Sequence, residues 1–596
     1  MTRRLLALAF TAFVALTLWA QEAQKREMRT VWIATVSNID WPQTRGTGTA
    51  TINKQKKQLT DLLDGFVKAN MNSVCLQVRP MADALYKSSY EPWSSYLTGT
   101  RGQDPGWDPL AFAVEECHKR GLEINAWVNP YRFSNSSGND CNTAIDQNLK
   151  NSGILMQVGN RIVFNPALKA SRDHLLKVCK EMIQNYDIDG IIFDDYFYPG
   201  GGTPEDSSAP DYQLYTQSNS GMSIGDWRRA NVNQMVKDMW DMVQATKPYV
   251  KFSIGPAGVA GQRSTSATKH GVVPVDEYCR ASDWQYTTIY SDPLAWLEEG
   301  TIDYISPQLY WKTNHTTNPF GPLTNWWSYI AEHFGRHHYA SHNIYFMEKT
   351  NTKADWDEIL QQIRYSRQYN RQNAPGVNFY SAKYIDGPTC KGLADYLSQT
   401  LFTHKALEPA MPWHSKTNYD APANLAYSGG TLSWTGVNKK LVRYSVYAVP
   451  LTVTLDEAQS QAFDGIKSDY LVGVTYTPSF KLDASLQSGY WYAVCVVDGW
   501  NNEFAPAFYN LATEYADKVT LVSPIAGATA TWNQQFAWTA ADGATYELQI
   551  SDDASFGNVL IQRKQITSNS ATVDLGDLAS GQTYYWRVAT LQPNRI

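Results

Sequence analysis

Short apolar runs alternate with longer amphipathic segments from about residue 29 to residue 402. Short β-branched runs are typical of strands buried in a parallel sheet, whereas apolar residues at every third or fourth position indicate helices. The predicted strands cover residues 29–35, 73–78, 123–128, 190–193, 251–254, 304–306, 343–346 and 377–380. The predicted helices between them cover residues 54–70, 109–120, 171–186, 226–246, 322–334 and 353–370. Eight strands that alternate with helices predict an α/β fold, a (β/α)8 TIM barrel with insertions.

The pattern changes after Pro412, where apolar and polar residues begin to alternate. Such alternation, broken by turn residues, predicts two small all-β sandwiches that are close to fibronectin type III in pattern. Their strands are expected at 431–434, 442–449 and 490–497, and at 536–538, 546–550 and 583–588. The predicted domains are therefore a barrel at 27–412, a first module at 420–515 and a second at 518–596. We expect the second module to lack a last strand, so that the chain is truncated or pairs that edge elsewhere.

The first twenty residues have the pattern of a secretory signal. Arg3 and Arg4 precede an apolar run from Leu5 to Ala20, after which the chain turns polar. A spanning helix would need roughly 20 apolar residues, and no later segment supplies them. We therefore expect residues 1–20 to be removed and the protein to be exported to the periplasm or the extracellular space, with no membrane-spanning segment.

Charge and cysteine content narrow the possible partners. Removal of Arg3 and Arg4 leaves 49 basic against 57 acidic residues and changes the formal net charge from −6 to −8. An acidic chain without basic clusters is a poor partner for nucleic acid. The seven cysteines are sparse and never form a C-x-x-C pair, which excludes a disulfide scaffold and gives no zinc signature. Since no G-x-S-x-G, P-loop or HExxH motif occurs, we expect no metal and no cofactor.

Two adjacent carboxylates follow the predicted strand at 190–193. Because buried strands do not carry free charge, Asp194 and Asp195 should lie at its carboxyl end, where catalytic groups gather in parallel α/β folds. Aromatic residues make up 13% of the chain, and Tyr196 follows the pair directly. This content suits rings that stack on sugars, although large β-rich cores also use Trp and Tyr. The two Asp residues could instead cap the next helix or bind a structural Ca²⁺.

The residues that follow the other predicted strands are polar and aromatic at once. A sugar needs this mixture, because its faces stack on flat apolar groups while its hydroxyls need donors and acceptors. The candidate substrate-binding residues are Arg79, Asp83, Tyr86, Asn129, Tyr131, Tyr196, Gln308, Tyr310 and Trp311. We expect Arg79, Asn129 and Gln308 to converge with the two Asp residues on one cleft. As alternatives, Arg79 could pair with an Asp at the barrel rim, Asn129 could satisfy loop backbone, and Trp311 could be buried packing.

Hydrolysis of a glycoside needs an acid for the leaving oxygen and a nucleophile or base. Two carboxylates this close repel each other, so one pKa should rise toward a value that suits an acid. In N-acetyl-sugar hydrolases with substrate assistance, one carboxylate orients the acetamido group and the other protonates the leaving oxygen. We assign Asp194 to orientation and Asp195 to general acid catalysis, leave the reverse order open, and keep Asp83 as the reserve carboxylate.

Several separated segments resemble the glycosyl hydrolase-like family 10, also called domain of unknown function 187. They are EMRTVWIA at 27–34, LQVRP at 76–80 with DALY at 83–86, AWVNPYR at 126–132, GIIFDDYFYP at 190–199 and DYISPQLYW at 303–311. The resemblance covers roughly residues 27–405. It implies an exported bacterial TIM-barrel glycosidase that acts on envelope glycans, with peptidoglycan strands stripped of their peptides among the substrates. The β-modules resemble accessory domains of secreted glycosidases, and we expect them to act as spacers or as docking modules at the cell envelope.

We therefore expect a secreted glycoside hydrolase whose partner is an oligo- or polysaccharide. The alternative is a catalytically inert glycan-binding or adhesion protein, because aromatic barrel mouths and β-sandwiches suit that role as well. New reducing ends after incubation with bare amino-sugar glycans would separate the two. A deacetylase or esterase would need a metal triad or a Ser nucleophile, and the sequence shows neither.

Overall fold

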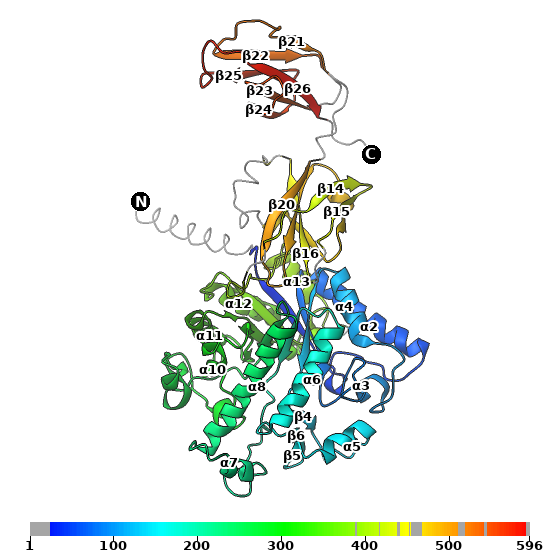
Figure 1. Cartoon of the computed structure of the whole chain (residues 1–596), viewed down its shortest axis with the longest axis vertical. Coiled ribbons are helices and arrows are strands. Elements are labelled where there is room, and N and C mark those ends of the chain that lie inside the picture. Colours follow the sequence, from blue (N-terminus) through cyan, green and yellow to red (C-terminus); the bar gives the residue numbers. More distant parts are fainter. Residues whose placement is uncertain are drawn as a thin grey trace.

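Eight parallel strands close into a barrel that is surrounded by helices (Figure 1). The computed structural model describes residues 24–591, apart from 137, 388–389, 416–417, 438–440, 452, 454–467, 511–518 and 541–544. The strands of the barrel are β1 (Met28–Ile33), β2 (Ser73–Arg79), β3 (Glu123–Val128), β7 (Gly190–Phe193), β8 (Lys251–Ile254), β9 (Tyr304–Ile305) continued by β10 (Gln308–Leu309), β11 (His337–His338) continued by β12 (Ala340–Asn343), and β13 (Gly376–Tyr380). β13 pairs with both β12 and β1, which closes the ring. The predicted (β/α)8 barrel is confirmed.

Amphipathic helices cover the outside of the barrel. In α2 the buried residues Leu59, Leu63 and Phe66 recur at helical spacing and pack into the core, and α4 begins where the side chain of Asp108 accepts a hydrogen bond from the amide of Ala111. The longer helices of the barrel are α2 (Thr49–Lys68), α4 (Pro109–Lys119), α6 (Lys169–Asn185), α8 (Ile224–Thr246), α11 (Phe320–Phe334), α12 (Lys353–Gln368) and α13 (Leu393–Thr400). All six helices predicted between the strands are present, with boundaries shifted by a few residues.

The seventh strand lies earlier in the chain than the sequence pattern predicts. Residues 343–346 were expected to form it, but the strand is β11 with β12, and Tyr345–Glu348 forms the 3-10 helix η4. Three histidines make the true strand look polar. They are buried all the same, and burial lowers the pKa of His337, His338 and His342 to about 3, so each is a neutral ring. The three neutral histidines are buried like apolar residues, so the hydrophobic pattern did not indicate a strand here.

Insertions gather at the carboxyl ends of the strands. After β3 the chain forms a small antiparallel sheet, β4 (Arg132–Ser134), β6 (Arg161–Phe164) and β5 (Leu155–Val158), and after β7 it forms α7 (Tyr212–Ser218). Figure 1 shows these elements at the end of the barrel that points away from the β-modules. The inserted elements therefore lie on the carboxyl face of the barrel, and the β-modules follow on its amino face.

Two all-β modules follow the barrel, and each consists of two antiparallel sheets. The first has sheets β14-β15-β18 and β17-β16-β19-β20, and the second has β21-β22-β25 and β24-β23-β26. Trp434 and Trp538 pack in the two cores. The strands are β14 (Ala423–Ser428), β15 (Thr431–Thr435), β16 (Arg443–Pro450), β17 (Leu471–Thr475), β18 (Ser479–Lys481), β19 (Tyr490–Val497), β20 (Glu503–Asn510), β21 (Leu521–Ser523), β22 (Asn533–Trp538), β23 (Thr545–Ser551), β24 (Val559–Ile566), β25 (Ser570–Asp574) and β26 (Tyr585–Leu591).

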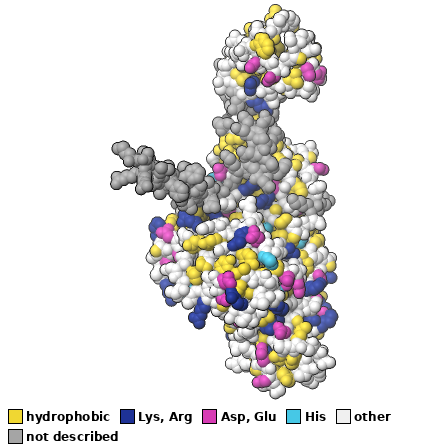
Figure 2. Space-filling model, turned by 90° about the vertical axis from the view of Figure 1, so that its left-hand side faces the viewer, with side chains coloured by type: hydrophobic (Ala, Val, Ile, Leu, Met, Phe, Trp, Pro, Cys, Tyr) yellow, Lys and Arg dark blue, Asp and Glu magenta, His cyan; other side chains and the backbone are white. Residues whose placement is uncertain are grey.

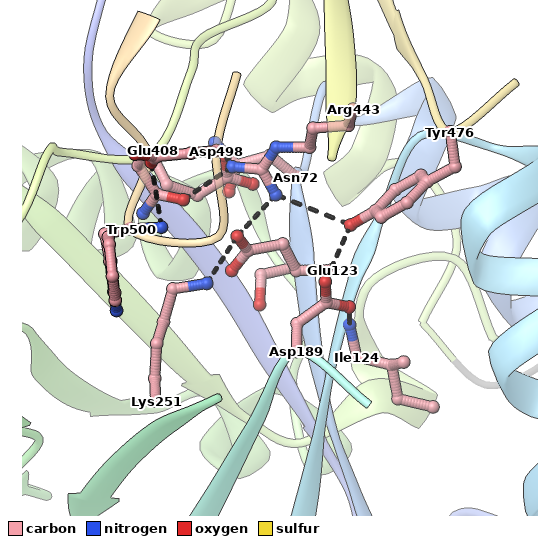
Figure 3. Close-up of polar contacts among 12 residues, drawn as sticks. Asn72, Glu123, Ile124, Asp189, Lys251, Glu408, Arg443, Tyr476, Asp498 and Trp500 are labelled. Carbon is pink, nitrogen blue, oxygen red and sulfur yellow. Dashed lines mark hydrogen bonds and ion pairs between the residues drawn. The ribbon is translucent and has the colours of Figure 1, made fainter. Parts of the chain in front are cut away.

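A buried ionic network joins the first module to the amino end of the barrel (Figure 3). Arg443 at the start of β16 binds Glu123, the first residue of β3, and its other terminal nitrogen lies 2.6 Å from Oε2 of Glu408. Nζ of Lys251, the first residue of β8, lies 2.7 Å from Oε1 of Glu123. All four side chains are almost fully buried. Arg443 and Lys251 thus face Glu123 and Glu408 within the network, although burial still raises the pKa of Glu408 to about 7.

Aromatic contacts flank this network on both sides. The ring of Tyr476 stacks on His118 with centroids 3.7 Å apart, and its hydroxyl donates to Asp189 at 3.0 Å. On the other side, Nε1 of Trp500 donates to the carbonyl of Pro248 at 3.0 Å, and its ring stacks on His414. The first module is thus packed against the barrel through charge and aromatic contacts.

The outer surface of the barrel is mixed in charge. On the face shown in Figure 2, Lys and Arg side chains lie among Asp and Glu side chains. Elsewhere on the barrel surface, oppositely charged residues pair four positions apart on one helix, such as Lys57 with Asp61 at 2.7 Å and Lys353 with Asp357 at 2.8 Å. Among the described residues, no helix is both long enough and apolar enough to cross a membrane.

Replacing Arg443 by Met should lower the free energy of unfolding by about 3–5 kcal/mol, because Glu408 would stay buried without its cation. Thermal or denaturant unfolding of the full chain measures this. Arg563→Met on the exposed surface of the second module is the matched control, and it should change stability by less than about 0.5 kcal/mol. Equal effects of the two substitutions would contradict the role given to Arg443.

Truncation should show which of the two modules the barrel needs for its stability. A chain that ends at residue 510 keeps every contact described above between the barrel and the first module, so its barrel should unfold at the temperature found for the full chain. A chain that ends at residue 419 lacks Arg443, Tyr476 and Trp500, and it should lose cooperative unfolding. Circular dichroism during heating measures both, and a native-like transition in the shorter chain would show that the barrel folds alone.

Candidate active site

The two adjacent carboxylates stand at the carboxyl end of β7. The strand is buried along its whole length, and Asp194 is the first residue after it. Neighbouring residues on a regular strand point to opposite faces, but the chain leaves the strand here. Four residues after Asp194, the amide of Tyr198 donates a hydrogen bond to the carbonyl of Ile289, which lies in the segment between β8 and β9. The pair therefore lies at the mouth of the barrel, between the loops that follow β7 and β8.

Asp194 is the more enclosed member of the pair, with only 3% of its surface exposed. Its Oδ2 accepts a hydrogen bond from Nε1 of Trp127 at 3.1 Å, and its Oδ1 accepts one from the amide of Tyr196 at 3.3 Å. Burial raises the pKa of Asp194 to about 8, and the charge of Asp195 adds to the rise, while Arg132 opposes it. Asp194 is thus a carboxyl group that holds a proton at neutral pH.

Asp195 is partly exposed and meets a different set of partners. The side chain of Gln308, at the end of the sixth strand, makes a hydrogen bond to it, and Gln308 is itself fixed by a 3.1 Å bond to the carbonyl of Gly255. Loss of water raises the pKa of Asp195 to about 6, and the hydrogen bonds limit the rise. Between these two pKa values the pair carries a single proton, so it contains one acid and one carboxylate.

Aromatic rings surround the pair. The guanidinium of Arg132 lies 3.7 Å from the centre of the Tyr196 ring, and 47% of Tyr196 is exposed. Tyr310 and Tyr380, at the ends of the sixth and eighth strands, stack with their centroids 5.6 Å apart. The charges of both Asp residues help to raise the pKa of Tyr310, although burial is the main cause, which puts this ring close to the pair. A flat, partly polar surface therefore borders the two carboxyl groups.

Asp40, which follows the first strand, holds the end of the eighth strand in position. Its Oδ1 accepts hydrogen bonds from Oγ of Ser381 at 2.8 Å and from the amide of Lys383 at 3.1 Å, and its Oδ2 accepts one from the amide of Ala34 at 2.7 Å. Burial raises the pKa of Asp40 to about 6. Because Ser381 directly follows Tyr380, this carboxyl group anchors the aromatic wall of the site.

The predicted site residues fall into two groups. The structure brings Asp194, Asp195, Tyr196, Gln308 and Tyr310 together at the mouth of the barrel. Trp311 lies next to them and packs on the loop after β8, where a methyl group on Gly258 would lie 2.8 Å from its Cζ3. The other five residues, Arg79, Asp83, Tyr86, Asn129 and Tyr131, are buried in the interior.

The interior group is engaged with the protein itself. Arg79 forms two hydrogen bonds to Glu91, at 2.8 and 2.5 Å, and Nδ2 of Asn129 donates to the carbonyl of Pro80 at 2.8 Å. Asp83 lies 3.4 Å from the guanidinium of Arg101. The physical reason is the long loop after β2, which folds back over the strand ends and supplies Glu91. Arg79 and Asn129 therefore do not join the Asp pair in an open cleft. Arg79 pairs with a carboxylate, Glu91 in place of the expected Asp, and Asn129 satisfies loop backbone, as the alternative for it stated.

Sequence reasoning did not single out Trp127, Arg132 or Tyr380. Trp127 lies on β3, which pairs with β7, so its indole can reach the carboxyl group that follows the neighbouring strand. Two signals were available: all three residues lie at or just beyond the end of a predicted strand, and Trp127 and Arg132 belong to the AWVNPYR segment that resembles the family. Among the residues that the structure describes, no group of three or more His, Cys, Asp or Glu is placed to hold a metal ion.

Comparison with known proteins connects this site to a family. The family model described as "Glycosyl hydrolase-like 10" matches residues 27–357. The chain is 38% identical over 431 residues to Glycosyl hydrolase YngK of Bacillus subtilis, covering 70% of this chain and 80% of that protein. It is 31% identical over 352 residues to Glycosyl hydrolase DigH of Escherichia coli K12, covering 56% of this chain and 77% of that protein.

Among solved structures, the chain is similar to the glycoside hydrolase domain of PgaB (BpsB) from Bordetella bronchiseptica. The identity is 12% and the TM-score is 0.41, over 59% of this chain and 94% of that one, a likeness too weak to bear on function. The family match, in contrast, covers more than half of the chain and includes both carboxylates at the mouth of the barrel. The chain therefore belongs to the glycosyl hydrolase-like 10 family and is a glycoside hydrolase.

Proposed function

We infer that this glycoside hydrolase acts on amino-sugar glycans of the bacterial envelope and that Asp194 and Asp195 are its catalytic residues. Peptidoglycan strands without peptides are the candidate substrate. The observation that carries the proposal is the split of the two carboxyl pKa values, about 8 and about 6, at one strand end beside aromatic rings. Chemistry at a glycosidic bond needs one proton donor and one carboxylate, and this pair supplies both near neutral pH.

The roles follow from access. Asp195 is partly exposed, so it is the group that can reach the leaving oxygen and act as general acid. Asp194 is enclosed and held by Trp127, which suits a group that orients the acetamido N–H of the sugar. A bond from that N–H stabilises the ionised form of Asp194, so the single proton of the pair passes to Asp195. The acetamido oxygen then attacks the anomeric carbon while Asp195 protonates the departing oxygen.

Water completes the reaction in the same site. Asp195, now a carboxylate, takes a proton from a water molecule as that water attacks the anomeric carbon and opens the cyclic intermediate formed by the acetamido group. Asp195 thereby regains its proton, and the acetamido group of the sugar is restored. Tyr310 and Tyr380 stack on each other and offer a surface for the sugar ring, and Asp40 holds the residue that follows Tyr380 in position.

Export and docking are further parts of the proposal. The signal-like segment at 1–20 lies outside the described residues, and its sequence pattern is what supports export. We assign both β-modules to a fibronectin type III-like class, supported by their two-sheet strand order. For the second module we propose docking to the envelope, supported by exposed apolar side chains that include Ile525 and Trp532, the latter 76% exposed.

The pH dependence of kcat/KM should be bell-shaped, with limbs near pH 6 and pH 8. Below the lower pKa both carboxyl groups are protonated and no carboxylate remains, and above the higher pKa both are ionised and no acid remains. Initial rates on a soluble amino-sugar oligomer across pH 4–10 measure this. A profile without a falling limb above neutral pH would contradict a protonated pair.

Substitution of either Asp by Asn should reduce hydrolysis by about 10²–10⁴-fold. Asp195→Asn should hardly change stability, whereas Asp194→Asn should cost about 1–3 kcal/mol, because the buried amide cannot accept from both Trp127 and Tyr196. An aryl glycoside with a very good leaving group should rescue Asp195→Asn more than Asp194→Asn, since departure then needs no proton. The opposite order would reverse the two roles.

Asp61→Asn is the matched control for these variants. Asp61 is an exposed residue of α2 that pairs with Lys57, so its loss should leave hydrolysis unchanged. Wild-type rates in both Asp194→Asn and Asp195→Asn would remove the pair from the mechanism.

A further inference from the structure

Beyond the catalytic pair, an aromatic ring and a cation meet at one point on the mouth of the barrel. Trp284, the first residue of α9 (Trp284–Thr287), is 42% exposed. A methyl group placed on Gly200 would lie 3.2 Å from Cζ2 of Trp284 and 3.9 Å from Nη1 of Arg161. Gly200 belongs to the loop that begins with the two catalytic residues. The indole and the guanidinium therefore border the same stretch of backbone.

Hydrogen bonds fix Trp284 relative to the catalytic pair. The side chain of Gln285, the next residue, donates to the carbonyls of Val259 and Ala257 in the loop after β8. Ala257 in turn forms a β-bridge with Gln308, whose side chain binds Asp195. Gly200 is five residues beyond Asp195, so even a fully extended chain would place it within about 17 Å. The ring thus stands at a set position within a few sugar residues of the reacting bond.

Arg161 lies on the same face of the small insertion sheet as Arg132, which is beside the catalytic pair. Arg132 is opposite Val163 in the antiparallel pair of β4 and β6, and opposite residues share a face. Arg161 is two positions from Val163 along β6, so it projects from that face as well. Its side chain is exposed and has no ion pair or hydrogen bond within the part of the chain that the structure describes. An unpaired guanidinium next to an exposed indole can bind a ring that carries a negative charge.

We propose that Trp284 and Arg161 form an outer subsite for a sugar residue that carries a carboxylate. The indole stacks on the apolar face of the sugar, and the guanidinium pairs with its carboxylate. This inference rests on the proposed function and narrows the substrate to chains of amino sugars with free carboxyl groups. A carboxyl group joined to a peptide through an amide has no charge to offer Arg161, so substituted chains bind more weakly.

Binding to the inactive Asp195→Asn variant of the full chain tests this subsite without turnover. The probes are peptide-free peptidoglycan strands and the same strands with their carboxyl groups converted to N-methylamides. The native strands should bind about fivefold more tightly, the size expected of one exposed ion pair. Adding Arg161→Gln should weaken binding of the native strands by the same factor and leave binding of the amidated strands unchanged.

Two further variants complete the experiment. Trp284→Ala should weaken binding of both strands by about tenfold, because stacking does not depend on the carboxylate. Arg563→Gln on the second module removes the same charge far from the site and should preserve the preference for native strands. Equal affinity for native and amidated strands, or a preference that survives Arg161→Gln, would overturn the outer subsite.

Hydrolysis by the unmodified protein, measured in parallel, reports on the proposed function separately. Cleavage of native and amidated strands at equal rates would refute the outer subsite and leave the catalytic assignment standing. No cleavage of any amino-sugar chain, combined with selective binding of native strands, would refute the proposed catalysis and support the subsite.

Discussion

The ion pair between Arg443 and Glu123 joins two parts of the chain that the sequence pattern treats as separate domains. Glu123 begins the third strand of the barrel, and Arg443 begins a strand of the first β-module. Burial of the Glu123 carboxylate is costly unless cations lie beside it. Lys251 pairs with Glu123 but not with Glu408, so Glu408 depends on Arg443. The barrel therefore depends on a residue supplied from outside it, and this dependence fixes the module at the amino face.

At the carboxyl end of the barrel, a buried carboxyl group lacks the ion pairs found at the amino end. Asp194 is as enclosed as Glu123, but no cation forms a direct ion pair with it among the described residues, and Arg132 opposes its neutralisation only in part. Its proton therefore stays bound up to about pH 8. At the amino end of the barrel, counter-charges accompany the buried carboxylates and contribute stability. At the carboxyl end, burial without a direct ion pair keeps one proton on the pair of Asp194 and Asp195 near neutral pH.

The sequence predicted those features that depend on local pattern. Seven of the eight strands and the position of Asp194 and Asp195 followed from apolar runs and their abrupt ends. The seventh strand was misplaced because His337, His338 and His342 look polar in a pattern and become neutral core groups only when buried. The role of Arg79 was equally hidden, since its partner Glu91 lies in a loop whose path no periodicity describes. Contacts between distant segments, such as Trp127 with Asp194, are decided by packing and leave no local signal.

The ionic network at the amino face also limits how such proteins can be recombined. The family match ends at residue 357, before the strand that closes the barrel and before Glu408 and Arg443. The segment that the family model describes is therefore shorter than the portion that folds as one body, although the alignment with YngK is longer, at 431 residues. A β-module taken from another protein would bring its own pattern of charges to the amino face of the barrel. A replacement for the first module would therefore have to supply a cation opposite Glu123 and Glu408, as Arg443 does here.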